Sequence, residues 1–221
     1  MEIQTNILKH YLKNCYFING TAYAGKSTMC KMLAEKYDMI HCEENYNMDM
    51  IMSIVTKEQQ PNLSYFQSKA SWQEYVSRTP EEYENWFKGT SREVAGFEIA
   101  ELIRLSTDKK VIVDTNIPCD ILKEISDYNH VVIMLSPQAM AVDKFFDRGD
   151  SEKQFLLTEI EKCPNPEESL RNFKECIAKI NSQENYDEFK NSGFLTIIRE
   201  DTEKDTREEV FEIIAKHFGL E

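Results

Sequence analysis

The sequence contains little glycine or proline and no long apolar segment. Only 7 glycines and 6 prolines occur among 221 residues, which excludes a collagen-like or low-complexity chain. The longest uninterrupted apolar run, Val131 to Leu135, is far shorter than the roughly 20 residues that a membrane-spanning helix needs. The first residues carry neither the basic nor the apolar stretch of a secretory signal. We therefore expect a cytoplasmic protein without a membrane segment.

Positive charge is also in short supply. Lys and Arg total 26 against 39 Asp and Glu, which gives a net charge of −13. A chain of this sign repels nucleic-acid phosphates and anionic lipids, so neither is expected as the main partner. The contents of hydrophobic residues (41%) and charged residues (29%) are typical of a packed domain. We expect one domain over residues 1–221, and no pattern indicates an oligomeric state.

Metal-binding patterns of cysteine and histidine are absent as well. The six cysteines include no Cys-x-x-Cys pair, and the four histidines form no couple with ligand spacing. A zinc site is therefore not expected. Without a secretory signal, the cysteines are expected to be free thiols in a reducing compartment.

Short apolar runs alternate with helical patterns, an order typical of parallel strands joined by crossover helices. The expected strands are Cys15–Ile18, Met39–Cys42, Val111–Val113, Val131–Leu135 and Leu195–Ile198. Residues from about 48 to 106 are too many for a simple crossover and predict a helical insert, with helices at 71–76, 80–87 and 91–105. Residues from about 144 to 192 predict a second, polar helical segment.

One segment matches the phosphate-binding pattern Gly-x-x-x-x-Gly-Lys-Ser/Thr at every fixed position. It reads Gly20-Thr21-Ala22-Tyr23-Ala24-Gly25-Lys26-Ser27 and is followed by Thr28. The motif follows the first expected strand and begins an amphipathic helix, so its backbone N–H groups and the helix N-terminus can point at phosphate oxygens. We predict that residues 20–28 bind ATP, that Lys26 also acts in catalysis, and that Ser27 ligates Mg²⁺.

At these residues the chain resembles the P-loop nucleoside triphosphate-binding proteins. It is most similar to their small kinase branch, which includes nucleoside and nucleotide kinases, shikimate- and gluconate-kinase-like enzymes and antibiotic phosphotransferases. The resemblance implies an α/β fold with a five-stranded parallel sheet in the order 2-3-1-4-5 and helices on both faces. It also implies that the insert at 48–106 binds the phosphate acceptor and that the segment at 144–192 is a lid.

The acidic run Glu43-Glu44-Asn45 follows the second expected strand, where open α/β sheets present their ligand crevice. Shikimate-kinase-like enzymes carry Asp-x-Asp there, and deoxynucleoside kinases carry a glutamate. An ungapped count from the lysine places Glu43 on the first of those aspartates, so we predict Glu43 as the catalytic carboxylate. The neighbouring Glu44 is an alternative for this role. The other alternative is that Glu43 is simply a solvated carboxylate on a surface loop.

Asp114 follows the apolar triplet Val111-Ile112-Val113, which is the form of a Walker B aspartate that binds Mg²⁺. Thr115-Asn116 after it resembles an element of kinases related to polynucleotide kinases. Because Pro118 and a helical pattern follow, Asp114 also fits the N-cap of the next helix, and the two roles are compatible.

Basic side chains provide candidates for the lid and the acceptor pocket. Small kinases place arginines after the fourth strand to stabilise the transferred phosphate, and here Arg148 follows Lys144 by one helical turn. A surface ion pair is the alternative role for Arg148. In the insert, the candidates for an anionic acceptor are Arg78, Arg92 and Arg104, with Arg92 preferred, and Arg199 is a candidate for the neighbourhood of the donor base.

These features together predict an ATP-dependent phosphotransferase that acts on a small-molecule acceptor. The alternative is a nucleotide-dependent regulatory switch or slow NTPase, because the lid arginines and a second acid do not complete the kinase pattern. A nucleic-acid end kinase is a third possibility, and the net charge weighs against it. The Asn-Lys-x-Asp signature of guanine specificity is absent, since Ile117-Pro118 follows Asn116.

Overall fold

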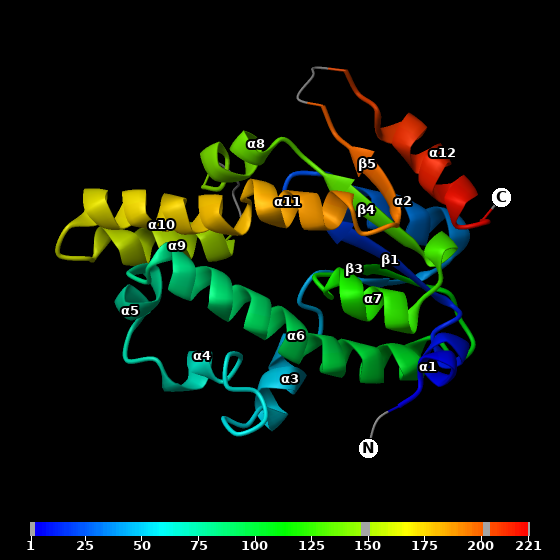
Figure 1. Ribbon diagram of the computed structural model, residues 1–221, viewed down its shortest axis with the longest axis horizontal. Coiled ribbons are helices and arrows are strands. Elements are labelled where there is room, and N and C mark those ends of the chain that lie inside the picture. Colours follow the sequence, from blue (N-terminus) through cyan, green and yellow to red (C-terminus); the bar gives the residue numbers. More distant parts are fainter. Residues whose placement is uncertain (1–2, 147–150, 201–203, 221) are drawn as a thin grey trace.

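A computed structural model describes residues 3–146, 151–200 and 204–220. Its strands form a single parallel sheet in the order β2-β3-β1-β4-β5 (Figure 1). The strands are β1 (Cys15–Gly20), β2 (Ile40–Cys42), β3 (Val111–Asp114), β4 (Val131–Leu135) and β5 (Leu195–Ile198). Helices pack on both faces of the sheet, so the predicted fold class and strand order are confirmed.

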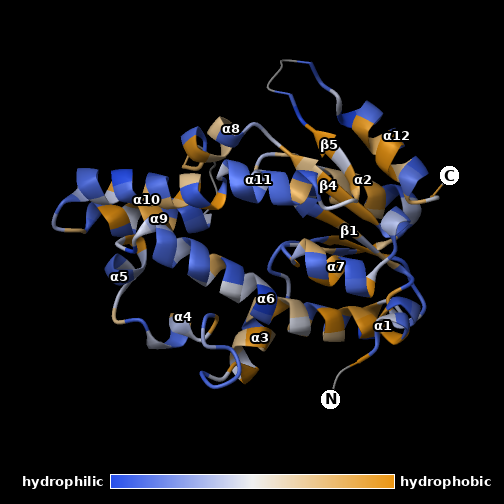
Figure 2. Ribbon diagram, viewed as in Figure 1, coloured by the Kyte–Doolittle hydropathy of each residue, from blue (hydrophilic) through white to orange (hydrophobic). Residues whose placement is uncertain are grey.

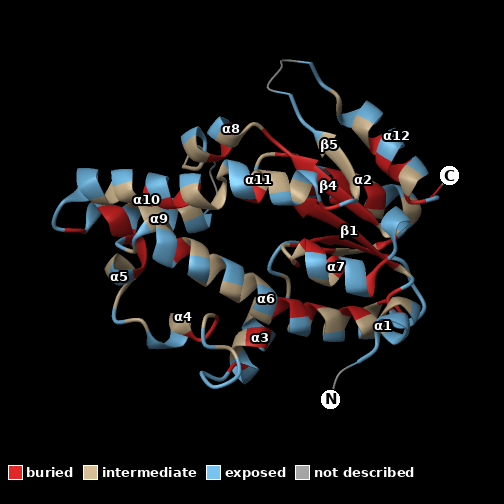
Figure 3. Ribbon diagram, in the orientation of Figure 1, coloured by how far each residue is buried: buried red, intermediate tan, exposed pale blue. Residues whose placement is uncertain are grey.

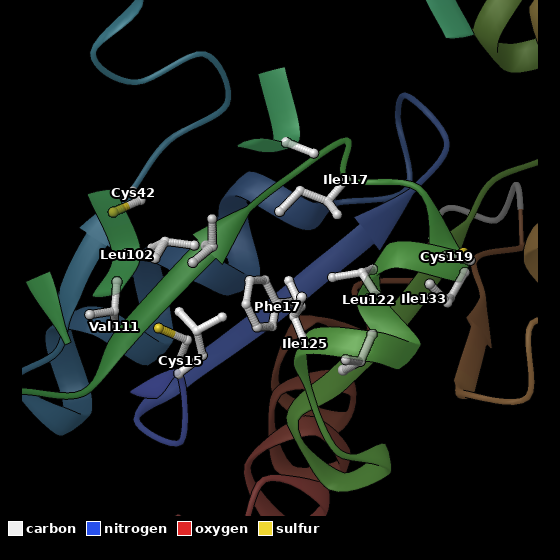
Figure 4. Close-up of a cluster of buried hydrophobic side chains, with 14 of the residues drawn as sticks. Cys15, Phe17, Cys42, Leu102, Val111, Ile117, Cys119, Leu122, Ile125 and Ile133 are labelled. Carbon is white, nitrogen blue, oxygen red and sulfur yellow. The ribbon is translucent and has the colours of Figure 1, made fainter. Parts of the chain in front are cut away.

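The central strands are buried on both faces, and successive side chains alternate between two hydrophobic clusters. Cys15 and Phe17 of β1 pack in the first cluster, shown in Figure 4, against α1 (Thr5–Tyr11), α6 (Pro80–Leu105) and α7 (Cys119–Ile125). Tyr16 and Ile18 pack in the second cluster, against α2 (Lys26–Tyr37) and α12 (Arg207–His217). The sheet is therefore the most apolar and most deeply buried layer of the fold (Figures 2 and 3).

The insert between β2 and β3 contains α3 (Met48–Ile54), α4 (Tyr65–Ser68), α5 (Trp72–Val76) and α6. The prediction of separate helices at 80–87 and 91–105 is wrong, because α6 runs unbroken through both. Thr79 and Glu82 form a capping box at its start. Gly89, a weak helix former, lies where a Cβ atom would be 2.5 Å from the Asn62 side chain, so its lack of a side chain allows the 61–64 turn to pack on the helix.

The segment after β4 packs against the insert. It comprises α8 (Gln138–Asp143), α9 (Ser151–Glu161), α10 (Pro166–Ile180) and α11 (Gln183–Lys190). Phe173 of α10 is fully buried in a third cluster with Tyr75 of α5 and Tyr83 of α6. This third cluster joins the predicted insert and lid into one helical body beside the sheet (Figure 1).

The longest helix, α6, has enough residues to cross a bilayer, but charged side chains occur along its whole length. Among the residues that the structure describes, no helix combines the length and the apolar composition that a membrane span requires.

Leu122 of α7 tests the first cluster, since its side chain is fully buried. We expect Leu122→Ala to lower the free energy of unfolding by about 2–5 kcal/mol, because it removes apolar contacts and leaves a cavity. Lys123→Ala, at the neighbouring exposed position, should change it by less than about 0.5 kcal/mol. Urea denaturation of both variants measures the difference, and equal effects would contradict this packing.

Candidate functional site

The turn between β1 and α2 has a backbone that only glycine permits at its first position. Gly20 adopts a φ of +129°, and a Cβ atom there would lie 1.9 Å from the carbonyl oxygen of Met134. Gly25, also at positive φ, is the N-cap of α2. The predicted phosphate-binding segment therefore connects a buried strand to a helix N-terminus, whose first N–H groups have no helical acceptor.

The end of β4 and the residues that follow it hold this turn in place. The N–H of Thr21 donates to the Met134 carbonyl at 3.0 Å. The Ser136 hydroxyl donates to the Ala22 carbonyl at 2.7 Å, and the Ser136 N–H donates to the Thr21 hydroxyl at 2.8 Å. Ala24 is buried in the second cluster, whereas Thr28 is exposed on the first turn of α2.

Lys26, Ser27 and Asp114 meet at the carboxyl end of β1 and β3. The Ser27 hydroxyl donates to Asp114 Oδ2 at 2.6 Å. Lys26 Nζ lies 3.8 Å from Asp114 Oδ1 and donates a hydrogen bond of 3.4 Å to the Thr21 carbonyl. The Lys26 and Asp114 side chains are both buried, so this ion pair is shielded from water.

The Asp114 carboxylate fits a magnesium ligand. Its Oδ1 atom is buried and receives no hydrogen bond from the described residues. Burial raises the pKa of Asp114, while Lys26 and the Ser27 hydrogen bond oppose that rise. A hydroxyl and a carboxylate at one point are hard oxygen donors of the kind that Mg²⁺ prefers. The alternative role as an N-cap is not observed, because α7 begins at Cys119 with Pro118 at its N-cap.

Beside Ser27, the helical body borders a large cavity that is partly open to solvent. Its volume is about 1230 Å³, against roughly 300–1,000 Å³ for typical small-molecule pockets. The walls come from the insert, from α9 and from Asn116 after β3. Because the cavity reaches Ser27, a molecule bound in it would lie next to the turn that is predicted to hold the phosphates.

Several polar side chains line the cavity together with Ser27. Asn116 donates a hydrogen bond of 2.7 Å from its amide to Glu44, and both side chains line the cavity. Glu43 and Glu44 are both exposed, but only Glu44 is part of the lining. The geometry thus favours Glu44 over Glu43 as the carboxylate at this position, since Glu44 lines the cavity and accepts the Asn116 hydrogen bond.

A second cavity carboxylate, Glu98 of α6, was missed by sequence reasoning. Its side chain is buried and accepts a hydrogen bond of 2.7 Å from the Thr115 hydroxyl. Burial raises its pKa to about 7, and the nearby charges of Glu44 and Asp114 add to the rise. The sequence does contain a sign of this residue. Glu98 lies four residues after Val94 and four before Leu102, so a carboxylate stands in the apolar stripe of the helix.

The segment that is predicted to form the lid lies only partly within the described residues. Arg148 lies outside the described residues, so its predicted catalytic role stays a prediction. The hydroxyl of Tyr23 donates to the Lys144 carbonyl, and Lys153 Nζ of α9 lies 6.0 Å from the centroid of the Tyr23 ring. Arg199, after β5, donates to the Tyr23 carbonyl at 2.7 Å. Basic residues from two segments, Lys153 of α9 and Arg199 after β5, therefore approach the turn that is predicted to bind phosphate.

The arginines proposed for an anionic acceptor do not line the cavity. Arg92 forms a bidentate pair with Asp120, and Arg104 pairs with Glu101. The guanidinium of Arg78 lies 3.7 Å from the centroid of the Tyr65 ring. Carboxylates therefore engage two of these arginines, whereas Nη1 of Arg78 is buried and has no hydrogen-bond partner among the described residues.

No model of a known protein family matches this chain, and no curated protein has a matching sequence. The functional interpretation consequently depends on the motif, on the strand order that the P-loop resemblance implies, and on the geometry of the site.

Glu98 generates a prediction about pH. Its folded pKa of about 7 lies above the ordinary value of 4.5, so between these values the folded state binds more protons than the unfolded state. The free energy of unfolding then falls as pH rises through that range. Glu98→Gln lacks this titration, so its free energy of unfolding should rise by about 1–3 kcal/mol relative to that of the wild type between pH 5 and pH 8. One pKa unit corresponds to about 1.4 kcal/mol.

Glu101→Gln on the same helix is the control for this experiment. The hydrogen bond from Arg104 lowers the pKa of Glu101, so its replacement should not alter the slope above pH 5. Urea denaturation at several pH values measures all three proteins, and parallel curves for Glu98→Gln and the wild type would rule out a raised pKa.

Proposed function

We propose that the protein is an ATP-dependent phosphotransferase of the P-loop kinase type, acting on a small-molecule alcohol. The observation that carries the proposal is the arrangement of Lys26, Ser27 and Asp114 beside a glycine turn at a helix N-terminus. The adjoining cavity supports transfer to an acceptor, because a regulatory switch needs no second enclosed site.

The donor phosphates are held by the main chain and by one lysine. The N–H groups of the 20–27 turn bind phosphate oxygens, and the Lys26 ammonium lies where it balances the charge that develops during transfer. Ser27 and Asp114 would hold a magnesium ion, which supplies charge neutralisation between the phosphates when bound. Asp114 also orients Lys26, since the two side chains approach within 3.8 Å.

The acceptor hydroxyl is oriented from the cavity side. Asn116 fixes the Glu44 carboxylate through its amide, which leaves the other carboxylate oxygen to accept the acceptor's proton. As the acceptor oxygen forms its bond to the γ-phosphorus, the bond to the bridging oxygen of ADP breaks and the proton moves to Glu44. Glu98, whose pKa is raised to about 7 by burial, places a second carboxyl group near Glu44 at this end of the cavity.

Lys26→Met tests nucleotide binding, since methionine keeps the length of the side chain and removes its charge. ATP with Mg²⁺ at a hundred times the dissociation constant should stabilise the wild type by about 2.7 kcal/mol. We expect most of this stabilisation to be lost in Lys26→Met, and none in Lys31→Met at an exposed position of the same helix. Thermal unfolding measures it, and an undiminished shift in Lys26→Met would refute the assignment.

Glu44→Gln tests the catalytic carboxylate, with Glu43→Gln as the adjacent control. Glutamine keeps an oxygen that can accept from Asn116 but is not a base. Once an acceptor has been found in a phosphotransfer screen, its turnover should fall about 10²–10⁴-fold in Glu44→Gln and change little in Glu43→Gln. The affinity for ATP should be unchanged in both. A loss confined to Glu43→Gln would restore the sequence-based assignment.

A further inference from the structure

The lining of the cavity is rich in aromatic rings. Eight of the 25 described residues that line it are aromatic, against 11% of the whole chain. Most of these rings pack on one another in the third cluster: the Trp72 and Tyr75 rings lie 5.8 Å apart, and the Tyr75 and Trp86 rings lie 5.2 Å apart. The cavity is thus lined by a rigid group of rings that need not rearrange to receive a ligand.

Phe87 of α6 differs from the other rings. It lines the cavity and is half-buried, yet it stacks on no other ring in the described part of the chain and belongs to none of the hydrophobic clusters found there. An apolar ring in this position has a face available to a ligand. A ligand with a flat aromatic ring would make the most favourable contact with such a face, because it can stack on the Phe87 ring.

The charges of the cavity disfavour an anionic acceptor. Glu44 and Glu98 lie at the end next to Ser27, and no described arginine lines the cavity. Lys69 lies 4.0 Å from the centroid of the Trp72 ring and donates to the Phe66 carbonyl, so its ammonium is already engaged by protein groups. Lys153, the other lysine of the lining, lies 5.2 Å from the centroid of the Phe145 ring and 6.0 Å from that of the Tyr23 ring, so its ammonium also lies against protein rings.

Because the Phe87 ring has a face available to a ligand and carboxylates lie at the end next to Ser27, we propose that the acceptor is an uncharged alcohol that carries a flat aromatic ring. Its ring lies against Phe87, and its hydroxyl lies at the Glu44–Asn116 end beside Ser27. A phosphate or carboxylate on the acceptor would be repelled by the carboxylates there. This inference deepens the proposed phosphotransferase function and rests on it.

Both tryptophans of the chain, Trp72 and Trp86, line the cavity, so tryptophan fluorescence reports its occupancy. The protein is first saturated with a non-hydrolysable ATP analogue and Mg²⁺, which blocks the donor site. Adenosine, cytidine and thymidine serve as uncharged ring-bearing alcohols, each is paired with its 5′-monophosphate, and sorbitol serves as a ring-free alcohol. We expect at least one nucleoside to change the fluorescence and to bind at least about tenfold more tightly than its monophosphate and sorbitol.

The role of the ring is tested with Phe87→Leu, which keeps apolar volume without aromaticity. Stacking of a base on an aromatic side chain is strong enough that its loss should weaken nucleoside binding by about 5- to 100-fold. Phe97→Leu is the matched control, since Phe97 is half-buried on the same helix and packs against residues of the cavity wall without lining the cavity itself. Equal affinities in the two variants would overturn the proposed ring contact.

Other outcomes also decide the proposal. A fluorescence signal that no nucleoside changes would overturn it. A response to sorbitol, or equal responses to a nucleoside and its monophosphate, would overturn it as well. A thermal shift with the ATP analogue measures the donor site separately. Binding of the analogue without a nucleoside response would overturn the acceptor class alone, whereas no binding of the analogue would overturn the phosphotransferase function itself.

Discussion

The pairing of β1 with β3 is the constraint on which the site depends. Parallel pairing places Ile18 opposite Asp114, so the chain leaves β1 toward the glycine turn at the same sheet edge where the Asp114 carboxylate ends β3. Lys26 and Ser27, on the first turn of α2, then reach that carboxylate although 87 residues separate Ser27 from Asp114. A slip of one residue in this register would turn Asp114 to the opposite face of the sheet and separate the three groups.

Burying charge at this edge has an energetic cost that the fold offsets only partly. Lys26 and the Ser27 hydroxyl compensate Asp114, but one of its oxygens receives no hydrogen bond from the described residues. Among the described residues, Glu98 has only the Thr115 hydroxyl as a hydrogen-bond partner, and it faces the charges of Glu44 and Asp114. Such groups reduce stability where they do nothing else, so their concentration beside one cavity supports a functional role.

The cavity exists because the insert and the segment after β4 share a hydrophobic cluster of their own. Phe173, Tyr75 and Tyr83 hold these helices together beside the sheet rather than on it. Their packing leaves a ring-lined space that ends at Ser27. The sheet therefore positions the glycine turn and the acidic residues, while the helical body provides the volume of the cavity.

Local patterns in the sequence were enough to predict the strands and the turn after β1. Apolar runs predicted all five strands to within a few residues, the glycine–lysine motif marked the turn between β1 and α2, and the sheet order followed from the family resemblance that this motif carries. Only the folded chain shows that α6 continues through Gly89, that Glu44 rather than Glu43 lines the cavity, and that Glu98 reaches the same cavity. The physical reason is distance along the chain: Glu98 meets Thr115, and Glu44 meets Asn116, only because the order of the strands brings their loops to one edge.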